Sequence, residues 1–531
     1  MGRLTMRTSL YPALALLATL SVSPAEQPIV SPFEVESWPV APSAIDTHVL
    51  AALAARGIEP AHPCSDAVFA RRVYLDVIGT LPRPDELRAF LGDTRPGKRA
   101  ALIDALLDRE EFADYWAMKW CDLLRVKAEF PVKLWPNAAQ AYHRWIRESV
   151  RLNKPYDQFV RALLTASGSN FRAPAVNFYR AMPSRTPEGI ARTVALTFMG
   201  TRLEKWPADR QADVAKFFAL VGYKGTSEWK EEIVYFDVVR ARAPAAATNA
   251  PTAFPDGSPV KVDPSRDPRQ VFADWLIDAK NPWFARSIVN RTWSWFLGRG
   301  IVHEPDDIRP DNPPSNPALL AYLEREFVTH GYDLKHIFRL ILNSRTYQLS
   351  SIPKPNQPPD AAGFSYYPLR RLEAEVLVDA LCQVTGTTET YVSPIPEPFT
   401  YIPPEHRSIT LPDGSITSSF LDLFGRPARD TGLESERNNN VTAGQRLHML
   451  NSEHIQSKIE KGPGLEAPMA VGQSPAEFAP ALYLTILSRY PTKEEVRTVD
   501  AYVKSNVDGA RAAAVDLAWA LINSTEFLYR H

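Results

Sequence analysis

Residues 65–79 read SDAVFARRVYLDVIG, and this stretch is the clearest indication of the fold class. Its apolar positions recur at intervals of three and four residues: Val68, Phe69, Val73, Val77 and Ile78. That spacing places them on one face of an α-helix. Ser65 stands directly before the helix, where a hydroxyl accepts a hydrogen bond from a free backbone N–H. The stretch therefore predicts a capped amphipathic helix.

The pattern of this stretch returns near the other end of the chain. Tyr74-Leu75, Pro82, Glu86, Leu87 and Arg88 reappear at a constant offset as Tyr483-Leu484, Pro491, Glu495, Val496 and Arg497. Each copy runs on to a second helix with a similar end, LDREEF at 107–112 and INSTEF at 522–527. A looser third copy of that end is LNSRTY at 342–347. We interpret the likeness as a repeated helical hairpin rather than a chance match of leucine-rich helices.

Helical periodicity continues through most of the chain. It predicts further helices over 84–92, 97–107, 111–126, 138–151, 156–165, 187–199, 208–221, 268–279, 282–297, 317–329, 334–343, 369–384, 441–450, 452–460, 475–487, 493–505 and 510–527. Strand patterns are scarce, and residues 232–239 are the best candidate. The expected fold is mainly α: two multi-helical domains with long proline-rich loops and an internal helical-hairpin repeat.

Breaks in the periodicity suggest the domain boundaries. We expect a signal peptide at 1–25, a proline-rich extension at 26–62, a first domain at 63–240, an Ala/Pro-rich linker at 241–267 and a second domain at 268–531. Each domain is expected to bury its own core. Residues 391–437 are rich in Pro and Gly and show no helical period, and loops this long are usually functional or tightly held.

The first residues and the composition indicate where the protein acts. Arg3 and Arg7 precede a ten-residue apolar run, and small residues follow at Ser23 and Ala25, which is typical of a cleaved signal peptide. Ten residues are too few to cross a bilayer of about 30 Å. The expectation is export to the periplasm or cell surface without a membrane span. A net charge of -1 argues against nucleic acid as a partner.

Only three cysteines are present, Cys64, Cys121 and Cys382. An odd number of widely spaced cysteines is not a disulfide framework, so at most one bridge can form and its pairing stays open.

Several motifs resemble a known pairing of domains. Residues 69–79 (FARRVYLDVIG) resemble the cytochrome-associated domain of unknown function 1549 of planctomycetes and verrucomicrobia. Residues 290–293 (NRTW), 367–372 (YPLRRL), 436–439 (ERNN) and 445–451 (QRLHMLN) resemble its usual C-terminal companion, domain of unknown function 1553. The resemblance implies a secreted protein, and many relatives carry a further cytochrome domain at the N-terminus.

One element of that family pattern is missing. The first domain usually carries Cys-x-x-Cys-His between a Gly-x-Arg-Leu-Glu flank and a Lys-Trp flank. Here Gly200-Thr-Arg-Leu-Glu204 runs directly into Lys205-Trp206. A c-type haem needs two thiols at that spacing and the adjacent imidazole. We therefore expect neither a covalent haem nor a thiol-anchored metal, and no cofactor is predicted.

The best candidate site is a set of charged and amide side chains in the second half. The set is Arg370, Arg371, Glu373, Arg426, Arg429, Glu436, Arg437, Asn438 and Asn439. Arginine forks can hold anionic groups of a ligand, and asparagine can read sugar hydroxyls. The same side chains can instead fasten the 391–437 loop to the helical body through buried ion pairs, and we favour that interpretation. A Glu373 and Glu436 pair for glycosidic hydrolysis is a weaker hypothesis, because it needs a specific separation.

Other residues invite a functional and a structural interpretation. Trp283, Trp293 and Trp295 can form a sugar-stacking platform, but a place in the core is favoured. His303, His448 and His454 are isolated in the sequence, and no metalloprotease, hydrolase or nucleotide motif occurs.

Two functions follow as hypotheses. The first is a binding or scaffold protein outside the cytoplasm, with a polysaccharide or another secreted protein as its partner. The alternative is an enzyme or accessory factor in the breakdown of sulfated polysaccharide, acting through the second domain; relatives are often encoded near sulfatase-like proteins.

Overall fold

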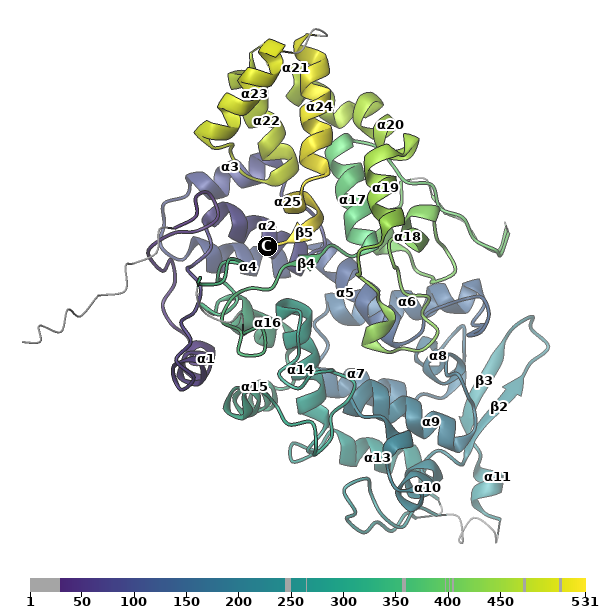
Figure 1. Ribbon diagram of the computed structural model, residues 1–531. Helices are drawn as coiled ribbons and strands as arrows, with labels where there is room; N and C mark the ends of the chain where they lie inside the picture. Colours follow the sequence, from purple (N-terminus) through teal and green to yellow (C-terminus); the bar gives the residue numbers. More distant parts are fainter. Residues whose placement is uncertain are drawn as a thin grey trace, which may run out of the picture.

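The structure is a computed structural model that describes residues 29–243, 250–263, 265–355, 360–396, 398–400, 402–403, 405–470, 474–505 and 509–531. The predicted signal peptide at 1–25 lies outside the described residues. The fold is mainly α, as the sequence predicts, with few and short strands (Figure 1).

The first half of the chain contains these helices: α1 (Ala44–Ala54), α2 (Asp66–Val77), α3 (Pro84–Gly92), α4 (Lys98–Leu107), α5 (Glu110–Leu123), α6 (Pro136–Arg151), α7 (Tyr156–Leu164), α8 (Asn177–Arg180), α9 (Pro187–Val194), α10 (Ala208–Lys216) and α11 (Val238–Ala241). A π-turn, Ala195–Met199, extends α9, and short 3-10 turns lie at Pro174–Val176 and Leu203–Lys205.

The second half contains these helices: α13 (Pro268–Leu276), α14 (Phe284–Leu297), α15 (Pro317–Thr329), α16 (Leu334–Leu342), α17 (Ala374–Thr385), α18 (Ser419–Leu423), α19 (Ala443–Asn451), α20 (Glu453–Lys461), α21 (Pro463–Ala470), α22 (Pro475–Leu487), α23 (Lys493–Ser505), α24 (Ala510–Ile522) and α25 (Thr525–Leu528). Short 3-10 turns lie at Ser408–Thr410 and Glu434–Glu436.

Local signals place some of the helix ends where the sequence predicts them. The Ser65 side chain caps α2 by accepting from the Val68 amide at 3.4 Å. Helices α3, α15 and α22 each begin at a proline, whose missing N–H costs nothing at that position. The predicted bounds of these three helices are confirmed.

Each copy of the predicted repeat forms a pair of helices, α2 with α3 and α22 with α23. In each pair an arginine contacts the repeated tyrosine and glutamate, although the two arginines do not occupy equivalent positions of the repeat. Arg109 bonds Glu86 at 2.9 Å and lies over the Tyr74 ring. In the second copy Arg489 bonds Glu495 and lies over Tyr483. The copies also touch, since Leu484 of α22 packs against Ala70 and Leu87 of α2 and α3.

The two halves of the chain share one core. A single cluster of buried hydrophobic residues runs from Ile45 to Phe527, so the expectation of a separate core in each domain is wrong. Figure 1 shows the yellow C-terminal helices directly above the purple α2 and α3. Arg71 of α2 links the two halves by donating hydrogen bonds to the carbonyls of Ile486 and Phe527, each at 3.0 Å.

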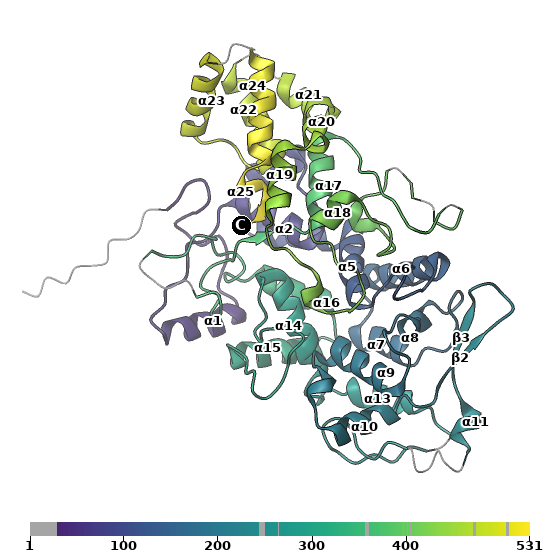
Figure 2. The same ribbon diagram turned by 45° about the vertical axis from the view of Figure 1, so that its right-hand side comes forward.

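Strands contribute at two places. Strands β1 (Gly168–Ser169), β3 (Glu232–Phe236) and β2 (Val221–Gly225) form an antiparallel sheet in that order. The β2–β3 hairpin lies at the edge of the molecule in both views (Figures 1 and 2). β3 confirms the start of the predicted 232–239 strand, which gives way to α11. The predicted 208–221 helix ends early, at Lys216, and β2 follows.

A second pairing joins the ends of the two halves. β4 (Arg370–Arg371) pairs antiparallel with β5 (Tyr529–Arg530). The sequence predicts a helix from residue 369, but α17 begins only at Ala374, because residues 370–371 are extended to form this pairing.

The segments expected to lack a regular pattern are ordered where they are described. The 26–62 extension contains α1, which packs on α15. In the 241–267 linker, Phe254 stacks on Phe217 and on Trp275.

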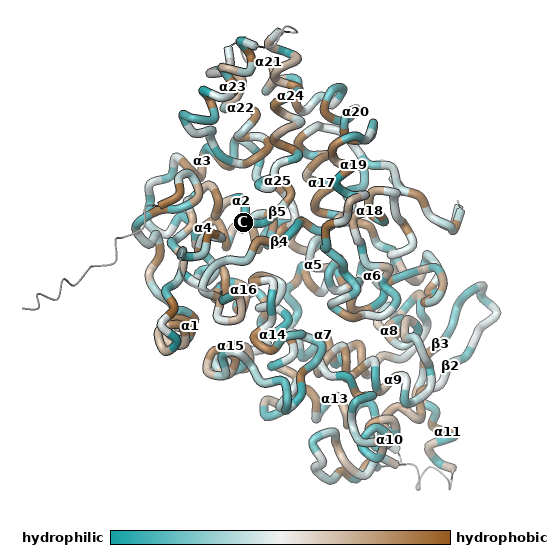
Figure 3. The backbone as a smooth tube through the Cα atoms, in the orientation of Figure 1, coloured by the Kyte–Doolittle hydropathy of each residue, from teal (hydrophilic) through white to brown (hydrophobic). Residues whose placement is uncertain are grey.

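Hydrophobic and hydrophilic residues alternate along most helices (Figure 3). None of the helices in the described ranges has the length and apolar character needed to cross a membrane.

Candidate functional site

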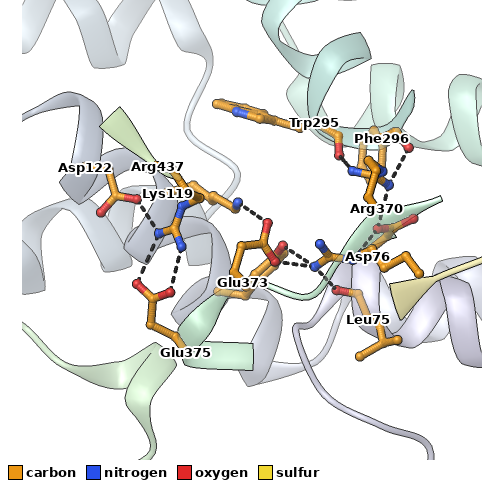
Figure 4. A network of polar contacts seen from close by, with 12 residues as sticks. Leu75, Asp76, Lys119, Asp122, Trp295, Phe296, Arg370, Glu373, Glu375 and Arg437 are labelled. Carbon is orange, nitrogen blue, oxygen red and sulfur yellow. Dashed lines mark hydrogen bonds and ion pairs between the residues drawn. The ribbon is translucent and has the colours of Figure 1, made fainter. Parts of the chain in front are cut away.

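Arg370 and Glu373, two predicted site residues of the β4–α17 segment, lie in a buried centre of ion pairs that joins both halves of the chain (Figure 4). Glu373 is the middle of this buried ion-pair centre. Its carboxylate bonds Lys119 of α5 at 2.6 Å and Arg530 of β5 at 2.6 Å. Burial alone would raise the pKa of Glu373, but Arg530 and Lys119 hold it well below its usual value. Glu373 is therefore ionised at neutral pH, and its buried ion pairs join α5 to β5.

Asp76, at the end of α2, is the second carboxylate of the centre. It pairs with Arg530 at 3.0 Å and with Arg370 at 3.2 Å. The Tyr347 and Tyr367 hydroxyls each donate to its other oxygen at 2.9 Å. Arg370 also donates to the carbonyls of residues 295 and 296, each at 2.7 Å. The two terminal nitrogens of Arg370 thus bond within the protein, while its buried Nε has no hydrogen-bond partner.

Arg437, at the end of the long loop, holds the other side of the centre. It bonds Glu375 of α17 at 2.6 Å and Asp122 of α5 at 2.6 Å. The Glu375 side chain has no exposed surface. Burial opposes its charge, yet Arg437 lowers the pKa of Glu375 to about 2. This pairing joins the loop to helices from both halves of the chain.

Arg429 and Arg426 extend the same fastening along the loop. Arg429 pairs with Asp122 at 2.9 Å, and Arg426 lies 3.6 Å from Glu375. Arg429 adopts a left-handed backbone conformation with φ of 60°, which is costly for a residue with a side chain. The Arg429 side chain is fully buried, and its ion pair with Asp122 contributes stability against that cost. These contacts are those that the fastening hypothesis requires.

The remaining predicted residues are dispersed. Arg371 donates to the side-chain amide oxygen of Gln445, and its guanidinium lies over the Phe424 ring. Glu436 accepts from the amides of residues 430–432, and these bonds lower its pKa. Asn438 accepts from the Asn440 amide, and Asn439 has a buried side-chain oxygen without a protein partner.

The hypothesis of a Glu373 and Glu436 pair for glycosidic hydrolysis is not supported. The two carboxylates have different partners and both have lowered pKa values, whereas glycosidic hydrolysis requires one carboxyl group with a raised pKa.

The lowered carboxyl pKa values predict acid sensitivity. The folded-state pKa of Glu375 is about 2, below its usual 4.5, so its stabilisation is complete above pH 4.5 and disappears as the pH falls towards 2. The shift corresponds to roughly 3 kcal/mol for Glu375. Urea unfolding at pH 6 and pH 3 should show this loss. Glu375→Gln should be less stable at pH 6 but should lose less on acidification; an unchanged pH dependence would contradict the assignment.

A cleft of about 850 Å³ lies away from this centre, between the two halves. One wall carries residues 201–210, and the other carries the start of α14 and the 302–314 loop. Trp206 and Trp283 face each other in it with ring centroids 5.6 Å apart. Six prolines stiffen the walls: Pro207, Pro255, Pro282, Pro310, Pro313 and Pro314. The volume is that of a small-molecule site.

The lining of the cleft contains more basic than acidic side chains. The basic residues are Arg202, Lys205, Arg210, Arg286 and Arg309, and the acidic ones are Asp256, Asp307 and Asp311. Asp307 pairs with both Lys205 at 2.9 Å and Arg309 at 3.1 Å. Arg202 is 4.0 Å from Glu304, and its buried Nε has no protein partner. Arg286 pairs with Glu324, which lies outside the lining, at 2.6 Å. Basic side chains thus lie beside the aromatic rings of the cleft, and most of them are paired with a carboxylate.

Comparison with protein families finds two matches, in the order that the motifs predict. A family of proteins of unknown function, DUF1549, matches residues 44–205, and a second such family, DUF1553, matches residues 268–503. No curated protein and no solved structure matches the chain.

The end of the DUF1549 domain borders the cleft. Glu204 and Lys205, the residues between which the haem element is missing, share one 3-10 turn, and Lys205 and Trp206 line the cleft. Its described lining contains no Cys, His or Met. Cys64 and Cys121 are buried elsewhere, and all three cysteines are free. The residues present do not fit a covalently attached haem at this position.

A smaller cleft of about 350 Å³ lies between the first copy of the repeat, in the DUF1549 domain, and α17 of the DUF1553 domain. It is lined by Asp379, whose pKa burial raises to about 6. Glu389 also lines it and bonds His454 at 2.9 Å, which in turn lies 3.1 Å from His448. The two histidines are therefore not isolated. Their contact was not predictable from the sequence, because the glutamate partner lies 65 residues from His454.

The three tryptophans considered as a sugar-stacking platform lie in different surroundings. Trp293 is fully buried, and Trp295 is 9% exposed, as the core interpretation expects. Trp283 instead lines the larger cleft. Its partner Trp206 was missed in the sequence because it lies 77 residues earlier, in the other domain.

Proposed function

We propose that this chain is an exported, haem-free binding protein whose ligand site is the cleft between Trp206 and Trp283. The ligand class that best fits is an acidic oligosaccharide. The observation that carries the proposal is the pair of partly exposed indole rings in a cleft whose lining has five basic and three acidic side chains. Aromatic rings pack on the apolar face of a sugar, and arginine pairs with its carboxylate or sulfate.

The buried centre supports the same assignment by elimination. Glu373, Arg370 and Arg437 are engaged with protein partners, and the space beside Lys119 and Arg437 is about 10 Å³, room for one water. The cleft, by contrast, is large enough for several sugar rings. We therefore assign the binding role to the cleft, and to the ion-pair centre a structural role in joining the long loop to helices of both halves.

Calorimetric titration with acidic and neutral oligosaccharides of equal length tests the proposal. Acidic chains should bind, more weakly at high salt. Trp283→Ala and Arg202→Ala should each weaken binding about tenfold, the equivalent of about 1.4 kcal/mol. Trp229→Ala and Arg151→Ala are matched controls, because both side chains are exposed outside the cleft. Equal affinities for all variants, or no binding of acidic chains, would refute the proposal.

One observation favours the alternative, an enzyme of polysaccharide breakdown. Asp379, with a pKa of about 6 in the smaller cleft, has the property of a general acid. Incubating the protein with the same oligosaccharides and measuring the length of the products decides between the binding and the enzymatic function. Shortened oligosaccharides with the wild type, and intact ones with Asp379→Asn, would replace the binding role by an enzymatic one.

A further inference from the structure

A cluster of two imidazoles and a carboxylate lies at the α15–α16 turn, apart from both clefts. Glu326 occupies the last turn of α15, His330 follows the helix directly, and His336 lies in the first turn of α16. The Glu326 carboxylate oxygen lies 3.4 Å from His330 Nδ1 and 3.2 Å from His336 Nε2. One potential ligand atom from each residue lies within 4.8 Å of the others.

We propose that Glu326, His330 and His336 bind a divalent transition-metal ion, Zn²⁺ in the first place. Zinc lies about 2.0–2.2 Å from imidazole nitrogen and carboxylate oxygen, which places neighbouring ligand atoms about 3.4 Å apart in a tetrahedron. The measured 3.2 and 3.4 Å separations match that value. Two nitrogen ligands favour zinc over Ca²⁺ or Mg²⁺, which prefer oxygen.

The turn that carries the ligands is held rigidly. Gly331 and Tyr332 both adopt left-handed conformations, which reverse the chain so that the two imidazole rings stack with centroids 3.7 Å apart. The Tyr332 hydroxyl donates to the Ile277 carbonyl at 2.9 Å. Asp333 accepts from the His336 amide and from Asn153. The site is preorganised by contacts outside it.

The charge and exposure of the cluster also suit a metal ion. Among the described residues, the ion-pair partners of Glu326 are these two histidines. His330 Nδ1 also contacts the Glu326 carbonyl at 2.9 Å and Thr329 Oγ1 at 3.3 Å, and metal binding replaces these bonds. The His330 side chain is 47% exposed, so a fourth position is open to water. Three protein ligands and one open position are typical of catalytic zinc sites.

Zinc titration of the tag-free chain, stripped with EDTA, tests the proposal. One equivalent of Zn²⁺ should bind, raise Tm by a few degrees and resist competition by Mg²⁺. Co²⁺ should give the visible bands of tetrahedral coordination. His336→Ala and Glu326→Gln should each weaken Zn²⁺ binding at least about tenfold, since loss of even an outer-shell partner has that effect.

His454→Ala is the matched control, because His454 belongs to another hydrogen-bonded histidine pair. It should bind Zn²⁺ like the wild type. Absence of a one-to-one complex would overturn the proposal, and so would a complex that His336→Ala and Glu326→Gln leave unchanged. Far-UV circular dichroism of each variant shows whether it is folded, and Glu326→Gln keeps the size of the side chain if the alanine variant fails to fold.

Discussion

Replacing Glu373 with alanine is expected to lower the free energy of unfolding by about 3–5 kcal/mol, because it leaves buried cations without their counterion. Lys119 is the most affected, since Glu373 is its ion-pair partner at 2.6 Å and the two side chains are 8% and 6% exposed. Arg530 loses its 2.6 Å bond at the same time and keeps Asp76. Urea unfolding followed by circular dichroism measures the loss.

Glu148→Ala is the control for this variant. Glu148 pairs with Arg151 at the surface, where their side chains are 50% and 40% exposed, and the expected loss is below about 1 kcal/mol. Glu373→Gln keeps the size of the side chain and removes its charge, so it should also be strongly destabilising. Similar losses for the buried and the exposed glutamate would show that the centre is not desolvated.

Replacing Arg437 with alanine is expected to cost about as much, on the order of 3–5 kcal/mol. It removes the closest cation from Glu375, which then has Arg426 at 3.6 Å, and it takes one of two arginines from Asp122. The long loop also loses one of its attachments to α5 and α17, while Arg429 and Arg426 keep theirs. Thermal and urea unfolding of the variant give the loss.

The exposed Arg151→Ala variant provides the comparison, with an expected effect below about 1 kcal/mol. A double variant, Arg437→Met with Glu375→Met, removes both charges and should be more stable than the sum of the single losses predicts. Additive losses in the double variant would contradict a direct interaction between the two side chains.

Features set by neighbouring residues were predictable from the sequence. Helices α3, α15 and α22 have the predicted bounds because a proline marks each start. The repeat was also visible, since its Tyr, Glu and Arg positions recur within short segments. The end of α10 at Lys216 was not predicted, because β2 is stabilised by pairing with β3 and not by its own sequence.

The site was harder to predict because its partners are distant in the chain. Most of the charged candidates of the second half lie together, although Arg371 and Glu436 do not. Their counterions Asp76, Asp122 and Lys119 come from the first half. Trp206 and Trp283 likewise belong to different domains. The Glu326 and His330 spacing of four residues is visible in the sequence. His336 joins them only through the left-handed turn at 331–332.

Amide hydrogen exchange with and without a saturating acidic oligosaccharide tests most directly whether the cleft is the ligand site. The proposal predicts added protection at residues 201–210 and 302–314, which form the cleft walls, and little change at 370–375 and 426–439. Protection confined to the ion-pair centre, with the cleft walls unchanged, would contradict it.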